Sequence, residues 1–194
     1  MQREFKLKIM IYFTIFYLSF FTILSVLDKN YEFLYYTFIM SFIVFVLILY
    51  YKKFNLSLNV MFGLTIVGVL HILGGNIFLD GVRLYDMWFI NGVFRYDNFV
   101  HMIGSFVAVF VVYSLLYPNL GKNLKYNRIL LSVIIVFMVL GIGAFYEIIE
   151  LVAVVFFNAA EKVGDYLNNA LDLVFNLIGC IIACFYLMDY HKKN

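Results

Sequence analysis

The sequence predicts an all-α polytopic membrane protein, a bundle of about six transmembrane helices that forms a single domain over residues 1–194. Hydrophobic residues make up 65% of the chain and charged residues only 13%, whereas soluble domains average about 25% charged residues. Six apolar runs approach or exceed the roughly 20 residues that a helix needs to cross a hydrocarbon core about 30 Å thick. A single proline in the chain agrees with long, unbroken helices.

The first three helices are bounded by polar and turn-forming residues. The first run is too long for the apolar core of a signal peptide and lacks a cleavage site of small residues, so we expect it to remain as a helix. The polar segment 28–30 follows it, Lys52 and Lys53 follow the second run, and Asp80 and Gly81 follow the third. These helices are predicted at residues 9–27, 33–51 and 56–79.

The last three helices have similar boundaries. Pro118 and Asn119 end the fourth run, and Gly164 and Asp165 precede the sixth. The fifth run is longer than a membrane crossing requires, so we expect it to tilt or to protrude from the bilayer. These helices are predicted at residues 97–117, 129–157 and 166–188.

The distribution of basic residues predicts the orientation of the bundle. Of the 14 Lys and Arg residues, ten lie at the termini and in the two loops on the same side of the membrane as the termini. The positive-inside rule therefore places both termini in the cytoplasm of a multi-pass plasma-membrane protein, with the lipid bilayer as its surroundings. The net charge of +2 forms no dense basic stripe, which excludes nucleic acid as a partner.

The longest predicted external loop covers residues 80–96 and is rich in aromatic residues. Aromatic side chains concentrate at the membrane interface, so we expect this loop to lie along the bilayer surface. It either anchors the protein there or acts as a lid over a site beneath it. The two cysteines, Cys180 and Cys184, lie four residues apart in one helix, a spacing that does not present disulfide geometry, and we interpret them as packing residues.

Ionisable and amide side chains inside the predicted helices are the most informative feature of the sequence. A charged group near the bilayer centre costs about 2.5 to 3.5 kcal/mol on insertion scales, so each needs a partner or a cavity. Spacings of three or four residues place these side chains on one face of each helix. They are His71 on the third helix, Asp97 and His101 on the fourth, Glu147 and Glu150 on the fifth, and Asn168, Asp172 and Asn176 on the sixth.

The predicted depths of these residues are similar. At 1.5 Å per residue, His71, Glu147 and Glu150 lie roughly 10 to 15 Å from the external ends of their helices. Asp172 lies about 9 Å and His101 about 6 Å from theirs. The polar stripes of four helices are therefore expected to meet in the outer half of the membrane.

Such a cluster favours proton transfer or metal binding. Carboxylates close together in a medium of low dielectric constant cannot all be ionised, so some must be protonated, be paired with His or Arg95, or bind a cation. We predict Glu147, Glu150 and His101 as catalytic acid–base residues. The predicted ligands of a divalent metal ion are Asp97, His101, Glu147, Glu150 and Asp172, with His71, Asp165, Asn169 and Asn176 as further polar site residues. None of their spacings is a named metal signature.

Each residue also has a structural interpretation. His71 and the Asn residues of the sixth helix are typical of hydrogen bonds between membrane helices. Asp97 and Asp165 are typical of helix N-caps. The pair of Glu147 and Glu150 has the weakest structural explanation, because two acids one turn apart in an apolar run are both costly.

Three motifs resemble those of a known family. Residues 96–101 with Gly104 resemble the Asp-x-x-x-His helix start of the YjdF-like uncharacterised prokaryotic inner-membrane proteins. Residues 144–150 resemble the Tyr-Glu-x-x-Glu segment of that family, and Gly164-Asp165 with Asp172 and Gly179 is similar to its closing pattern. The likeness covers roughly residues 70–185, with a looser likeness to VanZ-like proteins, and implies a setting in the cell envelope without supplying a reaction.

Three functions remain open on this sequence. In the first, the cluster opens toward the outer side and binds a metal or transfers protons on a lipid or lipid-linked substrate. In the second, the same acids carry the coupling ion of a small proton- or cation-coupled transporter. In the third, the polar side chains specify helix packing and do no chemistry.

Overall fold

The computed structural model describes residues 2–51, 53–54, 56–157 and 166–193. Within these residues, six helices are long and apolar enough to cross a membrane, which confirms the predicted fold class. They are α1 (Gln2–Leu27), α2 (Tyr31–Tyr50), α3 (Leu58–Asn76), α4 (Tyr96–Leu116), α6 (Arg128–Phe157) and α8 (Tyr166–Lys193).

Short elements connect the long helices. On one side of the bundle, η2 (Tyr117–Asn119) and α5 (Lys122–Tyr126) join α4 to α6. On the other side, α3 is followed by β1 (Phe78–Leu79), β2 (Val82–Arg83), η1 (Leu84–Asp86), β3 (Trp88–Ile90) and β4 (Phe94–Arg95).

The third helix ends earlier than the sequence predicts. We expected it to continue to residue 79, but α3 stops at Asn76 because Phe78 and Leu79 pair with β2 in a two-stranded antiparallel hairpin. Asp80 and Gly81 form the turn with φ angles of 52° and 81°. This left-handed conformation is typical of tight hairpin turns and is accessible to Asp and Gly. An apolar pair at a helix end is therefore compatible with either helix or strand, and the turn decides between them.

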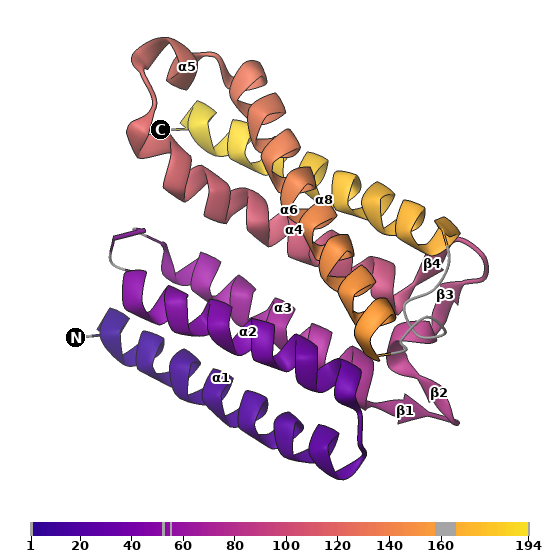
Figure 1. Ribbon diagram of the computed structural model, residues 1–194. Helices are drawn as coiled ribbons and strands as arrows, with labels where there is room; N and C mark the ends of the chain where they lie inside the picture. The colour runs from indigo at the N-terminus through magenta and orange to yellow at the C-terminus, as the bar shows by residue number, and fades with distance from the viewer. Residues whose placement is uncertain (1, 52, 55, 158–165, 194) are drawn as a thin grey trace.

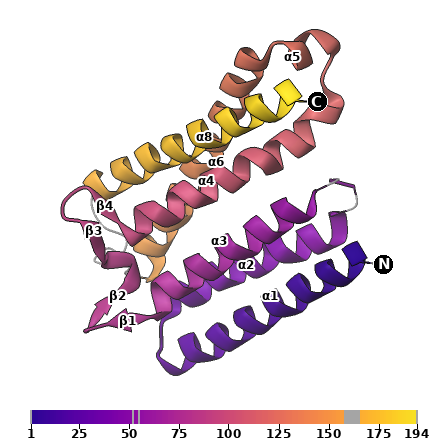
Figure 2. The ribbon, with the colours of Figure 1, turned by 180° about the vertical axis from the view of Figure 1, so that it is seen from behind.

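The six helices form two groups of three. Helices α1, α2 and α3 lie together, as do α4, α6 and α8, and both views show the two groups side by side (Figures 1 and 2). Helix α4 joins the groups because it packs against both α3 and α8. The start of α1 and the end of α8 lie at the same end of the bundle, and the β-strands lie at the opposite end (Figure 1). Which end faces the cytoplasm remains a prediction.

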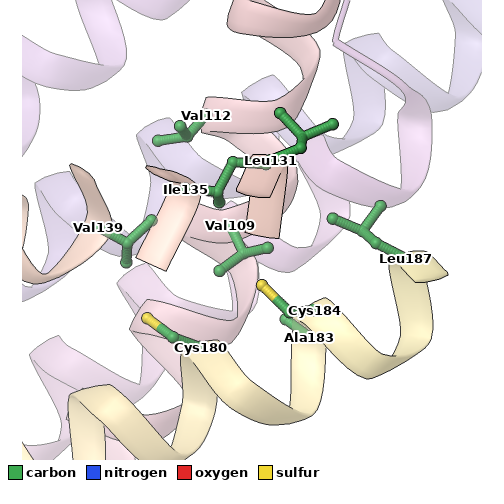
Figure 3. Close-up of a cluster of buried hydrophobic side chains, with 9 residues drawn as sticks. All are labelled: Val109, Val112, Leu131, Ile135, Val139, Cys180, Ala183, Cys184 and Leu187. Carbon is green, nitrogen blue, oxygen red and sulfur yellow. The ribbon is translucent and has the colours of Figure 1, made fainter. Parts of the chain in front are cut away.

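A dry apolar cluster holds the second group together at the end away from the strands. Val109, Ile135 and Cys180 are at most 1% exposed, and Cys184 lies beside them (Figure 3). Both cysteines are free and buried. The prediction that they are packing residues is confirmed. Polar residues of the same three helices lie nearer the strand end. The apolar cluster therefore holds together the helices that carry those polar residues.

Gly179 sets the close approach of α4 and α8. A Cβ atom at this position would overlap the main-chain carbonyl oxygen of Met102 on α4. A backbone atom cannot move aside as a flexible side chain can, so any larger residue must push the helices apart. The polar residues of α4 and α8 contact each other one to two turns away, so this glycine controls their distances.

We expect Gly179→Ala to lower the free energy of unfolding by about 1–3 kcal/mol, the usual range for overpacking. The measurement is the thermal or denaturant unfolding transition of the purified protein in detergent. Gly141→Ala is the matched control, because a Cβ atom at Gly141 meets nothing within 4 Å. Equal stability of the two variants would contradict this account of α4–α8 packing.

Candidate functional site

Asp172 of α8 is the centre of a buried hydrogen-bond network. Its Oδ1 accepts a hydrogen bond of 2.6 Å from Asn98 Nδ2, and its Oδ2 accepts one of 3.1 Å from Asn168 Nδ2. The side chains of all three residues are at most 1% exposed. Buried polar groups require such partners, because an unsatisfied group keeps its full desolvation cost. The network therefore fixes the carboxylate of Asp172 between α4 and α8.

Asp97 and His101 of α4 meet Asp172 across this helix pair. His101 Nε2 lies 3.7 Å from Asp97 Oδ1 and 4.0 Å from Asp172 Oδ1. One ligand atom from each of the three residues lies within 4.8 Å of the other two. Asp172 and His101 are buried and Asp97 is partly buried. This group of two carboxylates and one imidazole is referred to below as the Asp–His–Asp group.

The start of α4 is capped by Asn98 rather than by Asp97. Asn98 Oδ1 accepts a 2.8 Å hydrogen bond from the free main-chain N–H of Arg95. The guanidinium of Arg95 in turn donates to Asn168 Oδ1 and stacks over the ring of Trp88. The interpretation of Asp97 as a helix cap is therefore wrong. Its carboxylate is left to face His101.

Two tyrosine hydroxyls lie within hydrogen-bond distance of His71 on α3. The hydroxyl of Tyr85 lies 2.5 Å from His71 Nδ1, and that of Tyr146 lies 3.1 Å from the same nitrogen. Tyr146 also packs edge-on against the ring of His101, with centroids 5.4 Å apart. Tyr146 on α6 thus stands between the two histidines, which come from different helix groups.

The segment between α3 and α4 inserts Arg83 and Tyr85 into the bundle. Burial raises the pKa of Tyr85 well above its ordinary value, and the carboxylates of Asp97 and Glu150 raise it further. Tyr85 therefore keeps its proton at physiological pH and can donate it to His71. Residues 88–93 of the segment are exposed, and Phe89 and Ile90 are more than half exposed. The segment thus combines an outer apolar surface with side chains that cover the site.

Arg83 connects this segment to α2. Its guanidinium makes two hydrogen bonds to Asp86, of 2.9 and 3.1 Å, and lies 3.6 Å from Glu32 Oε2. Burial lowers the pKa of Arg83, but the hydrogen bond and charge of Asp86 and the charge of Glu32 outweigh burial, so the net pKa is raised. Arg83 stays charged. Both Arg83 and Glu32 are less than 10% exposed, so this is a buried ion pair.

The two glutamates of α6 occupy different surroundings. Both carboxylate oxygens of Glu147 are buried and have no hydrogen-bond partner within the described part of the chain. The charge of Glu147 interacts with those of His101 and Asp97. Glu150 lies one turn further along α6 and lines a small polar cavity with Glu32 and Arg83. Both glutamates therefore interact with Asp97, and Glu150 also faces the Arg83 ion pair, so that it lies between this pair and the Asp–His–Asp group.

A larger cavity of about 370 Å³ lies between the two helix groups. His71, His101 and Asn176 line its polar part, and apolar residues of α1, α2, α3 and α6 line the remainder. Ser105 donates a 2.6 Å hydrogen bond to Asn176 Oδ1, while Asn176 Nδ2 has no hydrogen-bond partner among the described residues. The polar network of α4 and α8 thus borders a large apolar space.

A comparison with known protein families gives one match. The family model described as "Predicted membrane protein (DUF2238)" matches residues 7–193, which is nearly the whole chain. The chain belongs to the DUF2238 family. This supports the prediction of a membrane protein family, whereas the likeness to YjdF-like and VanZ-like proteins is not itself part of the match. Searches among curated proteins and among solved structures give no match.

In this DUF2238 chain, the structure brings together most of the side chains that the sequence singled out. Asp97, His101 and Asp172 converge, Glu147 interacts with them, and His71 joins through Tyr146. Asn169 Oδ1 is buried without a hydrogen-bond partner in the described residues. Asp165 lies outside the described residues.

Sequence reasoning missed five residues of the site: Glu32, Arg83, Tyr85, Asn98 and Tyr146. Glu32 looks like an ordinary acidic residue in the first turn of a helix. Arg83 and Tyr85 lie in a loop, where no periodic pattern indicates which side chains are buried. The sequence shows Asn98 beside Asp97, but the role of Asn98 depends on its contact with α8.

Proposed function

We propose that the protein binds a divalent metal ion at the Asp–His–Asp group and uses it, with Glu147, for acid–base chemistry on a membrane-embedded substrate in the cell envelope. The convergence of Asp97, His101 and Asp172 carries this proposal. These residues lie within the spans of α4 and α8, where isolated charges are costly and mark functional sites.

The donor set fits a divalent ion. Carboxylate oxygen and imidazole nitrogen bind Zn²⁺ and Mn²⁺. Ligand atoms about 2.0–2.2 Å from a tetrahedral zinc ion stand about 3.4 Å apart. The distances of 3.7 and 4.0 Å from His101 to the two aspartates are wider than this, and the three ligand atoms lie within 4.8 Å of one another, so the group would contract around a bound ion. Asn98 and Asn168 already hold the Asp172 carboxylate by hydrogen bonds, and such bonds orient the ligands of metal ions.

Glu147 supplies the acid–base group of this proposal. Its carboxylate oxygens are buried without a hydrogen-bond partner in the described residues, and its charge interacts with that of His101. A carboxylate whose oxygens make no hydrogen bond is free to accept a proton from a substrate or from water. A bound divalent ion would supply Lewis-acid activation of an oxygen atom beside it.

The transporter hypothesis receives less support. A proton or cation path to the other side of the membrane needs polar groups along its length. Away from the polar part, the polar groups among the residues lining the large cavity are Thr14, Tyr17 and Thr65. A site that acts on a substrate from within the bilayer is the better match to this lining.

We expect the purified wild-type protein to retain about one divalent ion per chain after dialysis with Zn²⁺ or Mn²⁺, measured by mass spectrometry of the metal content. Asp97→Asn and His101→Ala each remove a proposed ligand and should weaken binding by at least about tenfold. Asp80→Asn is the matched control, because Asp80 lies in the exposed hairpin turn and Asn also accepts its φ of 52°.

Two results would reject the proposal. One is metal retention by the wild type that Asp97→Asn and His101→Ala leave unchanged. The other is no retention above the level of a detergent blank with either metal. If, in addition, the two variants unfold at lower temperature than Asp80→Asn, the polar group serves helix packing instead.

A further inference from the structure

The large cavity runs far beyond the polar residues. Along α2 its lining extends from Tyr36 to Ile48, which is about 18 Å of helix at 1.5 Å per residue. Beyond the polar part, residues such as Met40, Leu47 and Leu64 dominate the lining. Its volume of about 370 Å³ lies within the range of small-molecule sites. The cavity therefore has the length and the surface of a site for a hydrocarbon chain.

The residues of α2 and α6 that line the cavity include side chains that are half exposed. Ile43 of α2 and Ile142 of α6 both line it and are 51% and 52% exposed. Neighbouring residues that point away from the bundle, such as Phe42 and Phe145, are even more exposed and apolar. In a membrane-spanning chain, such a surface contacts lipid tails. An entrance between α2 and α6 would therefore face the hydrocarbon core of the bilayer.

The polar part of the cavity offers hydrogen-bond groups that no described residue satisfies. Tyr36 and Asn176 line the cavity and are 5% and 2% exposed, and the hydroxyl of Tyr36 and Nδ2 of Asn176 are buried without a hydrogen-bond partner in the described part of the chain. Asn Nδ2 can only donate, and a protonated tyrosine hydroxyl can donate as well. Because unsatisfied buried donors cost free energy, a ligand with oxygen acceptors at this place would be stabilised.

We propose that this cavity binds a membrane amphiphile with one long hydrocarbon chain, which enters from the bilayer between α2 and α6. The chain lies along the apolar lining, and a head group with oxygen acceptors, either a phosphate or a hydroxyl, lies beside Tyr36 and Asn176. This inference rests on the proposed function in one respect: it names the substrate class of the same site. Binding of the chain itself requires no metal.

Photolabelling tests the proposal. The probes are hexadecyl phosphate and hexadecanol, each with a diazirine in the middle of the chain, added to the full-length protein in lipid nanodiscs. We expect cross-links on cavity residues of α2, α3 and α6, such as Met40 and Leu64, mapped by peptide mass spectrometry. Preferential labelling by one of the two probes identifies the head group.

Two glycine variants provide the control. A Cβ atom at Gly104, which lines the cavity, meets only Val67 at an ordinary 3.8 Å, so Gly104→Phe fills the space from α4 without a backbone clash. Gly141→Phe places the same side chain on an exposed part of α6 where a Cβ meets nothing. We expect Gly104→Phe to reduce cavity labelling at least fivefold and Gly141→Phe to leave it unchanged.

Several outcomes would overturn the inference. They are labelling confined to outward-facing residues such as Phe137, equal cavity labelling in both glycine variants, and cavity labelling of equal strength by a diazirine alkane that lacks a head group. The last result would show that the cavity is filled by bilayer hydrocarbon only. Failure of the metal test alone leaves cavity labelling intact, so the two proposals fail separately. Asp97→Asn, which removes a proposed metal ligand, should keep the cross-links on Met40 and Leu64.

Discussion

Asp172→Leu is expected to lower the free energy of unfolding in detergent more than any other single change in the α4–α8 network. Leu cannot accept the hydrogen bonds from Asn98 and Asn168, whose amides then remain buried without this partner. Each unsatisfied amide costs about 1–3 kcal/mol. The residue is fully buried, so water cannot replace the carboxylate. Unfolding curves measured with increasing denaturant give the difference from the wild type.

Two further variants make this result specific. Asp172→Asn keeps the shape of the side chain and one acceptor oxygen, so its free energy of unfolding should lie between those of the wild type and Asp172→Leu. Asp28→Leu introduces the same change at an exposed position after α1 and should stay within about 0.5 kcal/mol of the wild type. An Asp172→Leu protein as stable as Asp28→Leu would show that the network does not stabilise the helix pair.

Arg83→Met is expected to produce the second large effect, at the end of the bundle that carries the β-strands. It removes the cation that lies 3.6 Å from the buried Glu32 and that binds Asp86 with two hydrogen bonds. Breaking a buried ion pair by removing one partner typically costs about 3–5 kcal/mol. Because Tyr85 follows Arg83 closely in the same segment, its hydrogen bond with His71 should weaken too. Unfolding curves and protease cleavage within residues 77–95 measure the two effects.

The double variant distinguishes charge from packing. Glu32→Gln removes the buried negative charge, so Arg83→Met with Glu32→Gln should recover a large part of the stability lost in Arg83→Met alone. Lys29→Met removes a cation from the loop before α2, where no buried ion pair is involved, and should change stability by less than about 0.5 kcal/mol. Additive losses in the double variant would contradict an ion pair between Arg83 and Glu32.

The polar residues on the helices could be found from the sequence because a membrane makes them conspicuous. His71, Asp97, His101, Glu147 and Asp172 each interrupt an apolar run, and helical geometry gives their depth and face. Spacing along one helix does not give the rotation of that helix against its neighbours. For this reason the sequence treated Glu147 and Glu150 alike, whereas in the structure both interact with Asp97 but Glu150 also lines the small polar cavity with Glu32 and Arg83.

The apolar part of the candidate site has no comparable signal. Ile43, Leu64 and Ile142 look like any other residue of a membrane helix, because lipid-facing and cavity-facing side chains have the same composition. Whether they line a cavity depends on the distance between the two helix groups. That distance is set by packing between helices that are far apart in the chain.

The amino-acid sequence by itself determined the membrane setting, the six spans and the residues that must avoid lipid, because transfer of apolar and charged groups between water and hydrocarbon depends on composition and length. Only the tertiary structure decided which polar groups meet. The contact of Asp172 with Asn98 and His101 depends on the close approach of α4 and α8 at Gly179, and the buried positions of Arg83 and Tyr85 depend on the folding of a loop onto α2 and α3. Such contacts join residues distant in the chain, and local periodicity carries no information about them.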